Sequence, residues 1–282
     1  MGQPIAMNLL RAGYRVAAYA RKPYAVQPLL EQNADIYHSP VELAQNCDVI
    51  ITNVSETSDV ESIVLGSDGM IHGLRAGGLV IDMSTISPEA TRHIAKKLAE
   101  HNIDMLDAPV SGGPQGAIDG NLSIMVGGKK KLFEKALPLF QVIGKNITHI
   151  GDHGAGQTAK ACNQLIVAQM MTAVAEAFIF AQASGVDPAK VREALMGGFA
   201  SSRILEIHGQ RMLSGDFTPG FKSKLHKKDL NIVMQEAQHL GLTLEATQLS
   251  QKYMEALTDN EADSSAIFTA IQTHNTRQET PS

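Results

Sequence analysis

The pattern of apolar and polar positions along the chain changes near residue 150. Before that point, short apolar runs at 47–54, 78–83 and 122–126 alternate with segments of helical periodicity at 88–101 and 130–140. Strands that alternate with helices predict a parallel α/β sheet. The first part of the chain is therefore expected to be an α/β domain, which we bound at residues 1–152.

The second part, residues 153–282, has no strand signal. One long helix is expected to join the two domains. Its run 165–181 is nearly apolar, but Gln169 and Glu176 interrupt it and no basic cluster flanks it. We therefore predict a central helix buried by its neighbours rather than a membrane span. Helices are predicted, with glycines between them, at 157–184, 188–196, 202–213, 223–240, 246–258 and 264–274.

The first 23 residues predict a helix, a short strand over 14–19 and a basic turn. This order is that of the second half of a nucleotide-binding βαβ unit. Gly2 lies where the third glycine of a G-x-G-x-x-G fingerprint would be, and Ala20 and Arg21 lie where the ribose of a dinucleotide is read. The first strand and the first two glycines, about 10 to 12 residues, are expected to be absent ahead of Met1.

Composition narrows the function classes. The net charge is -5, with 44% hydrophobic and 19% charged residues, so nothing indicates binding to nucleic acid or to an anionic membrane. Any anionic substrate has to be attracted by a local site. Only Cys47 and Cys162 are present, and the N-terminus lacks a secretory pattern, which together favour a reducing, cytoplasmic location.

Two glycine-containing stretches carry candidate chemistry. In 107–117, the loop Ser111, Gly112 and Gly113 lies between two prolines, and its converging N–H groups suit a carboxylate or phosphate. An ordinary glycine-rich turn is the alternative there.

In 153–164, a helix begins after two glycines and carries Lys160, with Asn163 and Gln164 on the same face. A buried lysine beside an amide suits proton transfer, although a lysine that reaches solvent from a helix end is an equal alternative. Cys162 points the other way and is expected to be a packed apolar residue.

A third stretch, 220–233, places Phe221, Lys228 and Asp229 near the start of a helix that could return toward the same site. A solvated basic face is the alternative. No metal site is predicted, because His149 and His153 are separated by glycines and lie in a loop.

Together these stretches resemble the β-hydroxyacid dehydrogenase family along the whole chain. The opening "MGQPIAM" is similar to the end of the family's glycine fingerprint, and "DAPVSGG" at 107–113 is similar to its substrate motif. "GAGQTAK" at 154–160 matches the family's G-x-G-x-x-x-K motif, and "KDL" at 228–230 matches its later K-D-L motif. The resemblance implies an N-terminally truncated Rossmann-like, doubly wound sheet followed by a helical domain for substrate binding and dimerisation.

The resemblance also implies a mechanism. Lys160 would protonate an aldehyde oxygen as hydride arrives from a nicotinamide held between the domains. Asn163 would hydrogen-bond the same oxygen or hold the lysine. The carboxylate of a small anionic substrate would bind at Ser111, Gly112 and Gly113. The cofactor would contact Met1, Gly2, Arg21, Val54, Thr85, Phe221, Lys228 and Asp229.

Details within the family favour one substrate. The K-x-x-N-Q arrangement after Lys160, with "GGFASSRIL" and "GDFTPGF", is similar to members that reduce tartronate semialdehyde to D-glycerate. Members that act on 3-hydroxyisobutyrate usually have K-x-x-N-N and are the alternative. A catalytically impaired cofactor-binding module is an alternative of another class. Ala20 followed by Arg21 favours NADPH slightly over NADH, and a homodimer or homotetramer is expected.

Overall fold

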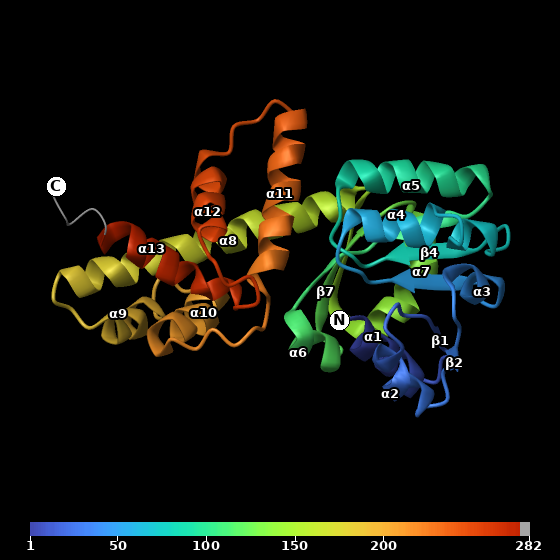
Figure 1. Cartoon of the computed structure of the whole chain (residues 1–282), viewed down its shortest axis with the longest axis horizontal. Coiled ribbons are helices and arrows are strands. Elements are labelled where there is room, and N and C mark those ends of the chain that lie inside the picture. Colours follow the sequence, from blue (N-terminus) through green and yellow to red (C-terminus); the bar gives the residue numbers. More distant parts are fainter. Residues whose placement is uncertain (277–282) are drawn as a thin grey trace. The chain divides into compact units, whose positions relative to one another are not determined.

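The computed structural model describes residues 1–276 and divides into two compact units, Met1–Lys160 and Ala161–Ser282 (Figure 1). Each unit has its own hydrophobic core. The fold class predicted from the sequence is confirmed, because an α/β unit precedes an all-helical one. The domain boundary at residues 152 and 153 stays a prediction.

The main sheet of the first unit has the order β3-β4-β5-β7-β6, with β8 also paired to β7. Strands β3, β4 and β5 are parallel and in register, so that Thr52, Asp82 and Asp107 lie side by side at their carboxyl ends. Strand β7 runs antiparallel to β5 and β6, so the sheet is mixed rather than wholly parallel. The strands are β3 (Val49–Thr52), β4 (Leu79–Asp82), β5 (Asp104–Asp107), β6 (Val110–Ser111), β7 (Leu122–Gly127) and β8 (Gly144–Gly151).

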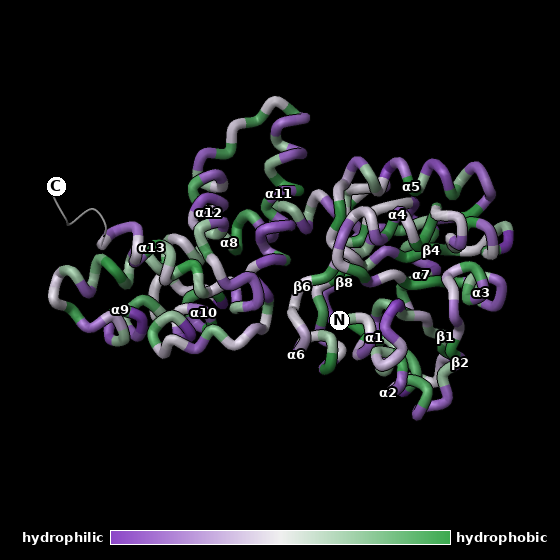
Figure 2. Tube along the Cα trace, in the orientation of Figure 1, coloured by the Kyte–Doolittle hydropathy of each residue, from purple (hydrophilic) through white to green (hydrophobic). Residues whose placement is uncertain are grey.

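Helices cover both faces of this sheet. Alternate residues of β4 point to opposite faces, so Ile81 packs with Ile5 and Phe140 on one face, and Val80 packs with Ile94 on the other. Figure 2 shows hydrophilic and hydrophobic stretches alternating along α5, as expected for a helix with one buried face. The first face is covered by α1 (Gly2–Arg11), α6 (Gly113–Ile118) and α7 (Lys130–Ile143), and the second by α3 (Pro40–Gln45), α4 (Thr57–Leu65) and α5 (Pro88–Glu100).

The sheet is interrupted where the sequence predicts a missing strand. Strands β1 (Ala17–Ala18) and β2 (Asp35–Ile36) form a separate two-stranded parallel sheet. Between β1 and β3 lies the place of the first strand in a doubly wound order. Within residues 1–276, β3 pairs only with β4, and its residue Val49 is 36% exposed whereas all of β4 is buried. Short helical turns at α2 (Gln27–Leu30), η1 (Pro23–Ala25) and η2 (Met70–His72) complete this unit.

The second unit is helical throughout its described part, apart from one isolated bridge between Lys222 and Asp263. Its core is built around Met171, Phe178 and Leu230, and the predicted helices are confirmed. The elements are α8 (Ala155–Ala183), which begins in the first unit, then α9 (Pro188–Leu195), α10 (Arg203–Ser214), α11 (Ser223–His239), α12 (Glu245–Glu255), η3 (Ser264–Ala266) and α13 (Ile267–Thr276).

Helix α8 is long and apolar enough, by length and composition alone, to cross a membrane. Only 39% of its most apolar window is buried, and this burial follows one stripe that includes Ala168, Ala175 and Phe178. The expectation of burial by neighbours is therefore met on one face only, since Ile166 is 51% and Phe180 75% exposed.

Candidate active site

The start of α8 is fixed to the carboxyl ends of β4 and β5. Asp107, the last residue of β5, accepts the N–H of Gly154 at Oδ1 (2.9 Å) and the N–H of Gln157 at Oδ2 (3.0 Å). The side chain of Gln157 in turn accepts the N–H of Ile86 (3.1 Å) and donates to the carbonyl of Ser84 (2.8 Å). Burial raises the pKa of Asp107, although these backbone hydrogen bonds act in the opposite direction.

The two glycines of the G-x-G-x-x-x-K motif allow this close approach. Gly154 has φ +88°, a conformation that side chains other than glycine rarely adopt. At Gly156, a Cβ atom would lie 2.4 Å from the carbonyl oxygen of Met125 and 2.7 Å from that of Asp107. The motif therefore packs the first turn of α8 directly against the backbone of the sheet.

Lys160 lies one turn beyond Gln157 and is 7% exposed. The alternative of a lysine that reaches solvent does not describe this side chain. Because Asp107 and Gln157 hold the helix start, the position of the Lys160 Cα is fixed relative to the ends of β4 and β5.

The next turn of α8 contains a chain of amide hydrogen bonds. Asn163 Nδ2 donates to Gln164 Oε1 (2.7 Å), and Gln164 Nε2 donates to Asp229 Oδ2 (2.6 Å). Lys228 Nζ lies 2.8 Å from Asp229 Oδ1, and His226 Nε2 lies 3.2 Å from the Gln164 carbonyl oxygen. The structure thus brings together five residues of the motifs at 154–164 and 220–233. Gln164, which the site prediction omitted, links them, and its place one helical turn after Lys160 is the signal that could have identified it.

Phe221 precedes α11, and Asp263 holds its backbone. Asp263 Oδ2 accepts the N–H groups of Gly220 and Phe221 (2.9 Å each), and the carboxylate also pairs with Arg211 (3.2 Å). Burial acts to raise the pKa of Asp263, but hydrogen bonds from His208, Phe221 and Ser265 outweigh it and hold the pKa well below its usual range. The Phe221 ring lies 5.5 Å from the His226 ring. Sequence reasoning gave no role to Asp263.

The candidate carboxylate loop lies at the end of β6. Gly112 has φ +134° and Gly113 has φ +66°, so both require glycine, and Ser111 is half-buried. Neither residue has a side chain to cover the backbone, and both are exposed. The backbone of this loop is thus accessible, as a site for an anion requires.

Several predicted cofactor contacts gather at the carboxyl edge of the sheet, where open α/β sheets bind dinucleotides. Val54 follows β3, and its N–H donates to Ser84 Oγ (2.9 Å); Thr85 follows β4 and is half-buried. Gly2 is the first residue of α1. A Cβ atom added to it would lie 3.6 Å from the Cβ atom of Asn53. The N-cap residue Met1 makes no side-chain hydrogen bond to this helix, and a helix N-terminus favours an anion such as a pyrophosphate. These residues therefore fit a dinucleotide.

Two predicted residues have surroundings that the sequence did not show. Arg21 forms an ion pair with Asp59 of α4 (3.0 Å). Cys162 is exposed, which corrects the expectation of a packed cysteine, because its face of α8 is not covered.

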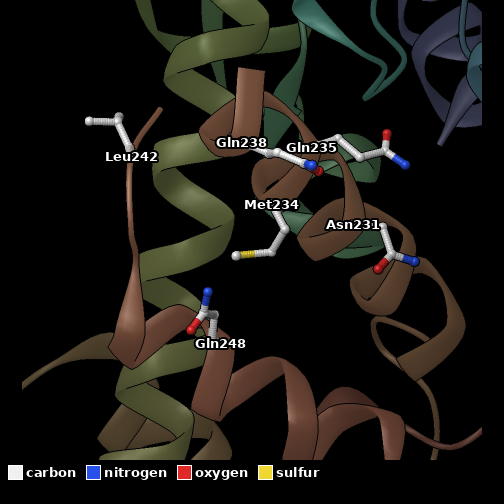
Figure 3. Close-up of a pocket in the computed structure, with 6 residues that line it drawn as sticks. All are labelled: Asn231, Met234, Gln235, Gln238, Leu242 and Gln248. Carbon is white, nitrogen blue, oxygen red and sulfur yellow. The ribbon is translucent and has the colours of Figure 1, made fainter. Parts of the chain in front are cut away.

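A cavity of about 350 Å³ lies beside α11 and α12 and contains none of the predicted site residues. In Figure 3, Met234 of α11 and Gln248 of α12 lie opposite each other across it. Its walls hold four amide side chains and no titratable group, so it offers no acid or base. The lining residues are Asn231, Met234, Gln235, Gln238, Leu242 and Gln248.

Comparison with known proteins gives the same class as the fold. Residues 1–151 match the family model described as the NAD binding domain of 6-phosphogluconate dehydrogenase. Residues 154–272 match the one described as NAD-binding of NADP-dependent 3-hydroxyisobutyrate dehydrogenase. The fold and these matches define an NAD(P)-dependent oxidoreductase that acts on a hydroxyl-bearing carbon.

Individual relatives indicate which family within this class of oxidoreductases the chain resembles. The chain is 45% identical to 2-hydroxy-3-oxopropionate reductase of Escherichia coli (strain K12), over 96% of this chain and 94% of that protein. It is 38% identical to 3-hydroxyisobutyrate dehydrogenase of Pseudomonas aeruginosa, over 84% and 82% of the two chains. The solved structure of Mycobacterium tuberculosis 3-hydroxyisobutyrate dehydrogenase with L-serine aligns with a TM-score of 0.88 at 29% identity, covering 96% of each chain. The chain belongs to the β-hydroxyacid dehydrogenase family, whose substrates are small hydroxy acids.

Proposed function

We propose that this enzyme reduces tartronate semialdehyde (2-hydroxy-3-oxopropionate) to D-glycerate with NAD(P)H. The observation that carries the proposal is the K-x-x-N-Q turn of α8, in which buried Lys160 is followed by Gln164 bonded to Asp229. The identity of 45% to a reductase of this substrate supports it. A 3-hydroxyisobutyrate dehydrogenase is the alternative, supported by the relative at 38% identity.

In the proposed reaction, the bound dihydronicotinamide supplies the hydride. The N–H groups of Gly112 and Gly113, with the hydroxyl of Ser111, bind the substrate carboxylate and orient the molecule. The Lys160 ammonium donates a proton to the aldehyde oxygen as that oxygen gains negative charge, and in reverse its amine accepts the alcohol proton. The backbone anchor at Asp107 holds Lys160 for this transfer.

Asn163 is proposed to distinguish the two candidate substrates. Its amide nitrogen donates to Gln164, which leaves its oxygen as an acceptor for a substrate hydroxyl. Tartronate semialdehyde has a hydroxyl at C2, whereas methylmalonate semialdehyde, the aldehyde related to 3-hydroxyisobutyrate, has a methyl group there. A site built to hydrogen-bond a hydroxyl discriminates strongly against an analogue that lacks it.

The test compares these two aldehydes with both cofactors. We expect kcat/KM for tartronate semialdehyde to be at least roughly tenfold higher. A reversed preference would favour the alternative substrate.

A second measurement tests the proton donor. Lys160→Ala should lower kcat at least ~100-fold while cofactor binding changes little. Lys160→Arg keeps the charge but is a poor proton donor, so it serves as a matched control and should be nearly as slow. Cofactor binding without turnover of any small aldehyde acid by the unaltered chain would instead indicate the impaired binding module.

The remaining proposals concern the cofactor, the assembly and the location. Arg21 and Lys22 after β1 support use of NADPH at least as well as NADH. Exposed apolar residues on α8, Ile166 and Phe180, support a homodimer or homotetramer. The two free cysteines support a cytoplasmic location, because thiols stay reduced in the cytoplasm. Phe221, Lys228 and Asp229 are proposed to contact the cofactor, as are Met1, Gly2, Val54 and Thr85.

A further inference from the structure

The guanidinium expected to bind a 2′-phosphate already has a partner. Arg21 Nη1 lies 3.0 Å from Asp59 Oδ1. Asp59 is the third residue of α4, and its other oxygen accepts the N–H of Glu56 (3.3 Å) in a capping box. Its side chain is 17% exposed, against 68% for Arg21. The carboxylate is therefore the member of the pair that the backbone anchors, and the guanidinium is the exposed member.

Both residues line a surface cavity of about 270 Å³. Its walls come from the end of β1, through Tyr19 and Arg21, from the loop before α3, through His38 and Ser39, and from α4. This volume is close to the ~300 Å³ at which ligand clefts begin. The cavity lies beside the position that reads the ribose in a dinucleotide-binding unit.

We propose that Asp59 determines the choice between NADH and NADPH, an inference that rests on the proposed function. In an NAD site, a carboxylate at the end of the second strand hydrogen-bonds the ribose 2′-hydroxyl and repels a 2′-phosphate. Here Ala20 and Arg21 follow that strand, β1, and the carboxylate comes from α4 instead.

Asp59 acts in two ways on the cofactor. It offers an oxygen to the 2′-hydroxyl of NADH. It also holds the guanidinium that a 2′-phosphate needs, so NADPH has to draw Arg21 away from a carboxylate that the backbone of Glu56 keeps in place. The pair therefore lets the enzyme use both cofactors and limits its preference for NADPH.

The experiment measures dissociation constants of NADH and NADPH by fluorescence titration of the full chain. Asp59→Asn keeps the side-chain volume and an oxygen that can accept the Glu56 N–H, but removes the charge. We expect this change to shift the affinity ratio toward NADPH about tenfold. Asp48→Asn is the matched control, because it removes the same charge from an exposed ion pair with Arg75 and should leave the ratio unchanged.

Arg21→Ala provides a second variant that leaves the Asp59 carboxylate in place. It should weaken NADPH at least roughly tenfold more than NADH, and adding Asp59→Asn to it should restore part of the loss. A ratio within about twofold of the unaltered chain in Asp59→Asn, or equal loss of both cofactors, would overturn the role of Asp59 while the proposed function stands. Failure of the unaltered chain to bind either cofactor would overturn both.

Discussion

An apolar strand added ahead of Met1 should join the two sheets of the first unit. Strand β1 pairs only with β2, and β3 only with β4, within residues 1–276, so each has an edge of backbone groups open to a partner. Val49 of β3 is 36% exposed and Ile51 is half-buried, and the latter packs on the same cluster as Val16 before β1. The perturbation is an extension of about ten residues, an apolar strand that ends in Gly-Leu-Gly-x.

The expected gain follows from the contacts that such a strand would make. Four new backbone hydrogen bonds contribute about 2–6 kcal/mol at 0.5–1.5 kcal/mol each. Three buried aliphatic side chains add about 5–9 kcal/mol. Ordering five residues costs about 7 kcal/mol. The net gain is about 3–4 kcal/mol at the centre of these ranges, which raises Tm by roughly 6–16 °C for a unit of this size.

The assay compares melting temperature and NADPH affinity for the chain, the extended chain and a control. The control carries an extension of equal length with serines in place of the apolar residues. The glycine turn supplies N–H groups to the pyrophosphate, so NADPH affinity should rise with Tm only for the apolar extension. If the chain melts as high and binds NADPH as tightly as the extended form, the place between β1 and β3 needs no strand, and this account of the sheet is wrong.

Three further predictions concern other parts of the molecule. Gly156→Ala should lower the free energy of unfolding by about 1–3 kcal/mol and reduce kcat, because its Cβ atom would meet backbone oxygens. Gly198→Ala is the control, because Gly198 faces open space, and it should change neither quantity in denaturation and rate assays. Burial raises the pKa of Asp82 from 3.8 to about 6, so the folded state holds the proton more tightly than the unfolded chain. The free energy of unfolding should therefore fall, on the order of 3 kcal/mol, as the pH rises between these values, and urea unfolding of Asp82→Asn should lack this decrease. Phe180→Ser should shift the mass measured by light scattering toward the monomer, and Leu240→Ser, equally apolar and exposed elsewhere, should not; an unchanged mass for both would contradict an interface on α8.

The elements with regular periodicity were predictable from the sequence. The amphipathic pattern at 88–101 and the apolar run 78–83 gave α5 and β4 to within one residue at each end, and the run 47–54 gave β3 to within two. Strand β5 was not predicted, because "DMLD" has too few apolar residues in a row to stand out, and β2, β6 and β8 were also missed. Short strands such as these depend on pairing with neighbours that no local pattern shows.

The candidate site, like the fold, was predictable from the sequence only in part. Lys160 was singled out because a lysine at the start of an apolar helix departs from the surrounding pattern, and its role in catalysis stays a prediction. The partners Asp107 and Gln157 lie 50 residues apart, and Arg21 and Asp59 lie on different elements, so only the folded chain shows their contacts. The basic turn at Arg21 predicted a phosphate site, and the structure adds the ion pair between Arg21 and Asp59.

The geometry of α8 explains why the motif after residue 154 combines glycines, a lysine and two amides. One turn before Lys160, Gln157 is bonded to the backbone at Ser84 and Ile86 and through its own N–H to Asp107. One turn after Lys160, Gln164 is bonded to Asp229. Lys160 thus lies between two hydrogen-bonded turns of a single continuous helix, and its side chain is buried there. Such rigidity suits the proton donor that we propose, because a positioned acid loses little entropy on reaching the transition state. The same argument explains why Gly156 belongs to the motif: a larger residue there would move the first anchor, and the lysine with it.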